Sequence, residues 1–317
     1  MKQPRINLFF ACDDLYVPFL GVTLLSIKET RDTTRAYDLR VLHTGIAEAS
    51  VRRLTQAFDE EDFHLTFHDI SATVQTLCDR FHTRDYYTKS TYYRLFIPNL
   101  FPELSRALYL DCDIVLCDDV AKLYDTDLEG LLVGAVADGF VQSVPTLYPY
   151  VEQRIGVARD QYFNAGVLLM DLDALRRAQF EEVFLRMLEQ VTFTVAQDQD
   201  YLNRICRDRC RLLDDAWNTM PNFERQDGPA KLVHYNLDSK PWHKDGLPFA
   251  DLFWSYADRS PYAEQIRSIR ASYTEELIRI TEEQTKGLME NAIKQAQDAE
   301  ENARIARVTS DILCANV

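Results

Sequence analysis

The stretch Leu108-Tyr109-Leu110-Asp111-Cys112-Asp113-Ile114-Val115-Leu116 sets two carboxylates into an otherwise apolar run. Residues two apart in an extended backbone point to the same face, so Asp111 and Asp113 can direct both carboxylates at one point. The apolar segment before them predicts a buried strand that ends where open α/β sheets place their ligands. Hard divalent ions that hold phosphates take one or two carboxylates, so the pair predicts a cation site. An acidic loop closing a strand would have the same pattern.

Length and composition indicate a protein that folds around its own core and does not span a membrane. The chain has 317 residues, 46% of them hydrophobic, enough for one large core or two modest ones. No stretch approaches the roughly 20 uninterrupted apolar residues of a membrane span, and residues 1–4 lead into a strand-like segment without a signal peptide. Seven cysteines without a C-x-x-C pair suit a reducing compartment. We therefore expect a cytoplasmic location.

The formal charge of -15 excludes several classes of partner. Nucleic acid and anionic lipid both demand a basic surface. An acidic protein can still bind a phosphorylated small molecule, but it needs a local metal ion or Lys and Arg side chains to overcome its own field.

The first part of the chain alternates between strand and helix patterns. Strands are predicted at 6–11, 39–43 and 65–68, and helices from about residue 18, at 47–58 and at 72–80. This alternation predicts right-handed βαβ units and an α/β fold with a mostly parallel sheet. Neither G-x-G-x-x-G nor G-x-x-x-x-G-K-[ST] follows the first strand, so phosphate must be held in another way.

The second half offers polar candidates at the ends of predicted elements. Strand 133–137 ends at Asp138, and strand 162–171 carries Asn164 and Gly166, where small residues allow a close approach to the backbone or form a bulge. A helix capped by Asp173 is expected to run to about Gln190. Residues 142–159 contain two prolines and no clear period, which predicts a substrate-facing loop.

Three further candidates have ordinary structural explanations when taken singly. Arg94 lies one turn into a predicted helix, where a solvated surface residue is usual. Asp198 opens another helix, where an acid can be merely a cap. His234 ends a short strand at 231–235; with two aspartates it leaves an octahedral ion three positions for phosphate oxygens or water, and imidazole suits Mn²⁺ better than Ca²⁺.

Beyond Pro261 the pattern becomes that of one long amphipathic helix. Its apolar stripe starts with large residues and fades to alanine, so we expect its first part to dock on the body and its end to project or self-associate. A solvated helix that frays after Gly287 is the alternative. The chain is thus divided into a catalytic domain at 1–259 and a helical extension at 260–317.

Taken together, these residues resemble glycosyltransferase family 8, which includes retaining galactosyl- and glucosyltransferases of bacterial lipopolysaccharide and surface glycan synthesis, and glycogenin. The resemblance extends from about Ile6 to Trp254 and rests on several ordered motifs. These are Phe10-Ala11-Cys12-Asp13-Asp14, Tyr93-Arg94-Leu95, Tyr109-Leu110-Asp111-Cys112-Asp113, Phe163-Asn164-Ala165-Gly166, Asp198-Gln199-Asp200, and His234-Tyr235 with Lys240-Pro241-Trp242.

The resemblance implies a GT-A type nucleotide-sugar-binding fold with a UDP-sugar donor. It implies Mn²⁺, with Mg²⁺ as the alternative, held by Asp111, Asp113 and His234 and bridging the donor's diphosphate. The other implied donor-binding residues are Ala11 and Asp13 at the uridine, Lys240 at the diphosphate, Arg94, Asn164 and Asp198 at the sugar hydroxyls, Gln199 beneath the anomeric carbon, and Cys112 and Ala165 within the same motifs.

Two positions depart from the family pattern, and the tail differs from that of some relatives. Leu15 stands where the family often has Asn, and Leu237 stands where a glycine commonly brings its backbone N–H close to phosphate. A leucine can offer that N–H only if its φ is negative. The C-terminal tail lacks the basic, aromatic character that binds membranes in some relatives.

The implied function is transfer of a hexose, glucose or galactose, from UDP to a glycan or glycolipid acceptor with retention of configuration. The amide of Gln199 is a poor nucleophile, so we expect front-face attack, with Gln199 and Asp198 stabilising the oxocarbenium character. One alternative is a catalytically silent UDP-sugar-binding or scaffold protein. Another is a sugar nucleotidyltransferase, which would need a Gly-rich basic loop after the first strand.

Overall fold

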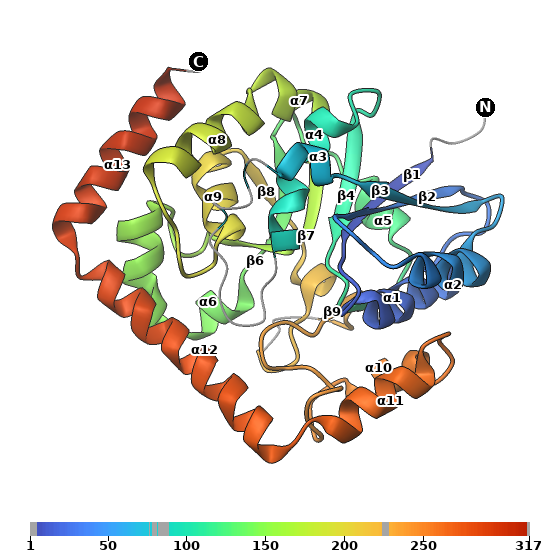
Figure 1. Ribbon diagram of the computed structural model, residues 1–317. Helices are drawn as coiled ribbons and strands as arrows, with labels where there is room; N and C mark the ends of the chain where they lie inside the picture. Colours follow the sequence, from blue (N-terminus) through green and yellow to red (C-terminus); the bar gives the residue numbers. More distant parts are fainter. Residues whose placement is uncertain (1–4, 76, 78–80, 82–88, 224–227, 316–317) are drawn as a thin grey trace.

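The central sheet is built around β4 (Arg106–Leu110), which lies between β1 (Ile6–Ala11) and β7 (Phe163–Asp171). The computed structural model describes residues 5–75, 77, 81, 89–223 and 228–315 (Figure 1). One seven-stranded sheet has the order β3-β2-β1-β4-β7-β6-β8. Its other strands are β2 (Tyr37–His43), β3 (Phe63–Asp69), β6 (Val133–Ala137) and β8 (Cys210–Leu212).

The directions of the strands confirm a mostly parallel sheet. Strands β3, β2, β1 and β4 run parallel, β7 is antiparallel to both β4 and β6, and β8 is parallel to β6. The crossovers are α1 (Val17–Thr30) and α2 (Glu48–Phe58), as the alternation predicts. Of the helix expected at 72–80, α3 (Ser71–Val74) is seen, while residues 76 and 78–80 lie outside the described ranges.

Side chains alternate along β4 between two apolar layers, one on each face of the sheet. Tyr109 belongs to the layer that includes Phe184, whereas Leu108 and Leu110 belong to the layer that includes Leu20 of α1. The remaining elements of the body are η1 (Lys89–Phe96), α4 (Ile97–Leu100), α5 (Ala121–Tyr124), α6 (Gly139–Ser143), η2 (Pro145–Leu147), η3 (Tyr150–Ile155), α7 (Leu172–Arg177), α8 (Phe180–Gln190), α9 (Asp198–Ile205), η4 (Asp215–Asn218) and α10 (Ala250–Ala257).

The apolar run that contains the two aspartates is split into two strands. Strand β4 ends at Leu110, and β5 (Ile114–Leu116) pairs instead with β9 (Leu232–His234) in a second, two-stranded antiparallel sheet. The register places Ile114 opposite His234. Asp111 and Asp113 therefore lie in the break between two sheets rather than within a strand, and β9 brings a histidine to that break.

Two local predictions are corrected. The helix after β7 is capped by Asp171, whose carboxylate accepts the N–H of Ala174 at 2.7 Å, and not by Asp173. That helix also ends at Arg177, because Gln179 adopts a left-handed backbone (φ 50°) before α8 begins. The segment 142–159 is not an irregular loop, since α6, η2 and η3 occupy much of it.

The C-terminal part is long and helical, but it is not one helix. It comprises α11 (Ala263–Ser272), α12 (Glu275–Ala296) and α13 (Ala299–Cys314). The side chains of Thr274 and Asp298 accept N–H groups of the turn that follows each, so new helices start there.

The docking of this part agrees with the expectation only at its start. Ile266 of α11 is buried against the body, as expected, but Leu277 and Ile280 of α12 are exposed. Leu288 and the alanines at 292 and 296 are again buried, so the later part of α12 docks on the body instead of projecting. The chain therefore does not fray after Gly287, and self-association through this segment stays a prediction. Within the described ranges, no helix combines the length and the apolar character that a membrane crossing requires.

Candidate active site

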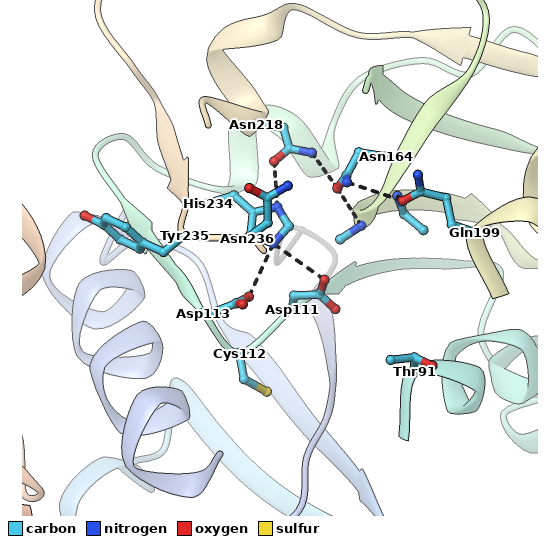
Figure 2. A network of polar contacts seen from close by, with 12 residues as sticks. Thr91, Asp111, Cys112, Asp113, Asn164, Gln199, Asn218, His234, Tyr235 and Asn236 are labelled. Carbon is cyan, nitrogen blue, oxygen red and sulfur yellow. Dashed lines mark hydrogen bonds and ion pairs between the residues drawn. The ribbon is translucent and has the colours of Figure 1, made fainter. Parts of the chain in front are cut away.

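Backbone hydrogen bonds on both sides of the sheet break set the positions of the two aspartates. The N–H of Asp111 donates to the carbonyl of Gly166 on β7 at 2.8 Å, and the N–H of Tyr235 donates to the carbonyl of Asp113 at 2.9 Å. Asp111, Asp113 and His234 each offer one possible ligand atom, and these three atoms lie within 4.8 Å of one another (Figure 2). The three predicted metal ligands are thus brought together.

Hydroxyl groups of α1 satisfy the backbone where the main sheet stops. The buried Thr23 hydroxyl lies 3.0 Å from the carbonyl of Cys112 and 2.8 Å from that of Ile114, and Ser26 Oγ accepts the N–H of Leu116 at 3.0 Å. Without these partners the bent backbone would leave polar groups buried and unpaired. A helix of the first βαβ unit therefore supports the break.

A chain of amides orients His234. The backbone N–H of Gly166 donates to Asn164 Oδ1 at 3.0 Å, which makes that atom an acceptor, and Asn218 Nδ2 donates to it at 2.9 Å. The remaining Asn218 atom, Oδ1, faces His234 Nδ1 at 2.9 Å, so Nδ1 is the donor. Nε2 is then the nitrogen that faces Asp113 at 3.3 Å and Asp111 at 3.7 Å.

This arrangement fits a divalent cation. Two carboxylates and an imidazole nitrogen face one another, and a cation bound between them would balance the negative charge of the carboxylates. Gly166 leaves the room, because a Cβ at this position would lie 2.4 Å from His234 Cε1 and 2.6 Å from Asp111 Oδ2. A ligand set of carboxylate oxygens and one imidazole suits Mn²⁺ or Mg²⁺ better than it suits a soft metal ion, which prefers sulfur ligands.

Lys240 balances the charge on the second aspartate. Its buried Nζ donates to Asp113 Oδ2 at 2.6 Å and to the carbonyl of Tyr235 at 2.8 Å. Burial by itself would raise the pKa of Asp113, but Lys240 and His234 together hold that pKa well below its usual value. Asp113 is therefore a carboxylate over the whole working pH range.

Arg94 is a buried residue of the site and not a solvated one. Its side chain is 4% exposed, its Nη2 lies 3.2 Å from Asp111 Oδ1, and its guanidinium stacks 4.3 Å from the centre of the Tyr109 ring. Its Nε lies 3.0 Å from Asp198 Oδ2, so Asp198 is more than a helix cap. Burial nevertheless raises the pKa of Asp198 to about 7, against the opposing effect of Arg94.

Gln199 is held at both ends of its amide. Its Oε1 accepts the Asn164 amide at 3.3 Å (Figure 2) and the N–H of Ala165 at 3.0 Å. Its Nε2 donates to Asp138 Oδ2 at 2.9 Å and to the Tyr162 hydroxyl at 3.2 Å. Asp138 was visible in the sequence as an acid ending a strand, but its bond to Gln199 was not predicted.

Asp200 anchors the two tyrosines behind Gln199. Its carboxylate accepts the hydroxyls of Tyr150 and Tyr162, each at 2.7 Å, and the N–H of Ala196 at 2.9 Å. Sequence reasoning noted Asp200 but missed these tyrosines and Asn218. For Asn218 the sequence contains no signal, since it lies in the short helix η4 among ordinary polar residues.

One cavity contains most of the predicted donor-binding residues. It has a volume of about 1270 Å³, open solvent at its mouth included, and its lining includes Ala11, Cys112 and Ala165 together with the charged residues above. A hydrogen bond with Cys12 and burial raise the pKa of Cys112, which stays a neutral thiol. Asp13 turns its carboxylate to the N–H groups of Leu15 and Tyr16, and its contact with uracil stays a prediction.

The two departures from the family pattern differ in their structural consequence. Leu15 is 75% exposed, so its side chain contributes little here. Leu237 lines the cavity with φ at 49°, the left-handed region that glycine adopts freely. The condition of a negative φ is not met; this leucine instead takes the backbone conformation typical of glycine.

Comparisons with known proteins agree with this fold and site. The profile described as Glycosyl transferase family 8 matches residues 7–246, and the chain therefore belongs to that family. General stress protein A of Bacillus subtilis is 25% identical over 280 residues, which cover 81% of this chain and 94% of that protein. Lipopolysaccharide 1,2-glucosyltransferase of Escherichia coli is 24% identical, over 82% of this chain and 79% of that protein.

Solved structures show the same architecture. The galactosyltransferase LgtC, in complex with donor and acceptor sugar analogues, superposes with a TM-score of 0.67 at 26% identity, covering 80% of this chain and 96% of LgtC. The bifunctional glycosyltransferase WbbM gives a TM-score of 0.73 at 24% identity, covering 84% of this chain and 52% of WbbM, which is a likeness of fold. The protein is a family 8 glycosyltransferase with a GT-A fold.

Proposed function

We propose that this glycosyltransferase moves a hexose, glucose or galactose, from a UDP-sugar to a glycan or glycolipid acceptor with retention of configuration. The observation that carries the proposal is the group of three possible metal ligands, Asp111, Asp113 and His234, beside the buried Lys240 in a cavity that Gln199 also lines. The names of a lipopolysaccharide glucosyltransferase relative and of the LgtC complex with donor and acceptor analogues support the substrate classes.

Asp111, Asp113 and His234 would hold Mn²⁺, with Mg²⁺ as the alternative. When bound, the ion supplies positive charge that stabilises the leaving diphosphate. Lys240 adds a second cation at this end of the cavity, and its ammonium can exchange the Asp113 carboxylate for a phosphate oxygen. Arg94, Asn164 and Asp198, which line the same cavity, would bind the hydroxyls of the donor sugar.

Retention of configuration requires either a covalent intermediate or attack on the face from which the leaving group departs, and the chemistry of Gln199 favours the second route. Its amide is a poor nucleophile, and four hydrogen-bond contacts hold it in one orientation. The acceptor hydroxyl therefore attacks the anomeric carbon on the face from which UDP departs. The bond from that carbon to the phosphate oxygen breaks, and the hydroxyl proton passes to a phosphate oxygen of UDP. Gln199 and Asp198 stabilise the positive charge on the ring.

The remaining proposals concern organisation. We assign residues 1–259 to the catalytic domain and 260–317 to a helical extension. The free thiols among the described cysteines support the cytoplasmic location proposed from the sequence.

The test is release of UDP from a panel of UDP-sugars with Mn²⁺ or with EDTA. We expect metal-dependent release from one hexose donor and its loss in Asp113→Asn, while the surface control Asp173→Asn behaves as the parent. UDP binding with no release from any donor, measured with and without glycan acceptors, would instead favour a silent binding protein.

A further inference from the structure

Resting on the proposed function, we infer that the acceptor carries an apolar aryl or alkyl group beside its reactive hydroxyl, and that Leu288 of α12 forms part of the wall that binds it. Leu288 lies beyond residues 7–246, the region that matches the family profile. The helical extension would thus be an acceptor-specificity element of this chain.

The lining of the cavity is chemically divided. One part consists of the charged and amide side chains already described, and the cavity opens to solvent at its mouth, where an acceptor can enter. Apart from the charged residues already described, its lining contains a group of apolar side chains: Phe140, Val141, Leu147, Val151, Val195 and Leu288.

A series of contacts leads from the metal ligands past Gln199 to the helix that carries Val151 of this apolar wall. From His234 the hydrogen bonds lead through Asn218 and Asn164 to Gln199. They continue from Gln199 through Tyr162 and Asp200 to Tyr150 of η3, the helix on which α12 packs. A donor held by the metal ligands and Gln199 therefore leaves the apolar wall for the group that approaches the anomeric carbon.

The chemistry of the wall favours an apolar group over a second bare sugar. The hydroxyls of Tyr150 and Tyr162 are both engaged by Asp200, so they do not have to serve a ligand. Sugar hydroxyls against aliphatic side chains would lose their hydrogen bonds to water without replacement. Gln197 lines the cavity with its Nε2 buried and without a hydrogen-bond partner among the described residues, so it offers one donor to a linking oxygen.

Leu288 is fixed in place by the packing of its helix. It is 7% exposed, and the next turns of α12 bury Ala292 and Ala296. Gln295 and Asn291 both donate to the Thr194 hydroxyl, at 2.5 and 3.2 Å, which ties α12 to the segment that carries Val195. On the same helix Leu277 is 41% exposed and does not line the cavity, so it provides a matched control.

Equilibrium binding tests the inference without needing turnover. Matched methyl and phenyl hexosides are titrated calorimetrically into the full chain with UDP and Mn²⁺. We expect phenyl glycosides to bind at least about tenfold more tightly than their methyl partners. Leu288→Ala should reduce this ratio to below about threefold with UDP affinity unchanged, and Leu277→Ala should preserve it.

Leu288→Phe is a second variant in case Leu288→Ala does not fold. Phenylalanine keeps the position apolar and narrows the cavity. It should weaken phenyl glycosides at least about tenfold with UDP affinity unchanged. Equal binding of the two glycoside classes by the parent, or an unaltered ratio in a folded Leu288 variant, would overturn the inference. Failure of the proposed function would appear separately, as absent release of UDP from every donor.

Discussion

His234 donates its Nδ1 proton to Asn218 Oδ1 at 2.9 Å, and this single bond decides which nitrogen faces the two aspartates. Asn218 can accept it because its own amide nitrogen is engaged by Asn164. The tautomer of the proposed metal ligand is therefore set by a residue that does not touch the metal site.

Replacing Asn218 should weaken metal binding. In Asn218→Ala the imidazole loses its acceptor and can turn or change tautomer, so we expect Mn²⁺ affinity to fall about 10–100-fold. Titration calorimetry with Mn²⁺ in the presence of UDP measures this. Asn291→Ala, on α12, is the control; equal affinities in the two variants would contradict the assigned role.

Gly166 should not tolerate even one methyl group. The added Cβ of Gly166→Ala would lie within 2.6 Å of both His234 and Asp111, and one of these ligands must move. We expect metal-dependent UDP release to fall at least about 100-fold. Gly287→Ala is the matched control, because open space surrounds its position in α12 and alanine favours a helix by about 1 kcal/mol.

Gln199 should matter for turnover more than for binding. Gln199→Ala removes the amide oxygen beneath the proposed anomeric position, so kcat should fall about 100-fold while the Kd for UDP stays unchanged. Initial rates and UDP titrations separate the two quantities. Gln56→Ala, exposed on α2, should match the parent. Near-normal turnover in Gln199→Ala would remove the proposed role.

The left-handed backbone at Leu237 predicts different effects on stability for two substitutions. Leu237→Gly relieves backbone strain in the folded state but increases the conformational entropy of the unfolded chain. Because these effects oppose each other, the free energy of unfolding should change by less than about 1 kcal/mol. Leu237→Val puts a β-branched residue at φ 49° and should cost about 1–3 kcal/mol. Denaturant titrations measure both, and a stable Leu237→Val variant would show that the backbone relaxes there.

His243 should make the fold sensitive to acid. It stacks on Tyr273 at 3.8 Å, and burial, helped by Lys240, Arg270 and Lys244, lowers the pKa of His243 to about 3. Below pH 6.5, the unfolded pKa of this histidine, the unfolded chain binds a proton that the folded protein does not bind. This uptake stabilises the unfolded state, so the free energy of unfolding falls as the pH drops from about 6.5 towards 3.

The corresponding test compares unfolding at pH 7 and pH 5. The parent should lose about 2 kcal/mol at this histidine over that interval. Most of this loss of stability should disappear in His243→Gln. The control His64→Gln, at an exposed position, should lose as much stability as the parent. Identical pH profiles for the two variants would mean that His243 takes up its proton in the folded state.

Prediction from the sequence was most successful where the signal is local. Strand β1, the crossover helices α1 and α2 and strand β6 follow from periods of a few residues. It was least successful at boundaries that depend on competing caps, as at Asp171 and Thr274. Arg94 shows the same limit, since a lone arginine on a helix gives no sign that Tyr109 and two aspartates will enclose it.

By itself the sequence determined the chemistry available at the site: two carboxylates one residue apart, an imidazole, an ammonium and an amide, in an acidic chain that needs a cation to hold phosphate. Only the tertiary structure decided that β9 carries His234 to the sheet break, that Asn218 orients its imidazole, and that Leu288 lines the cavity. These relationships join residues far apart in the chain, and packing, not spacing along the sequence, sets which of them meet.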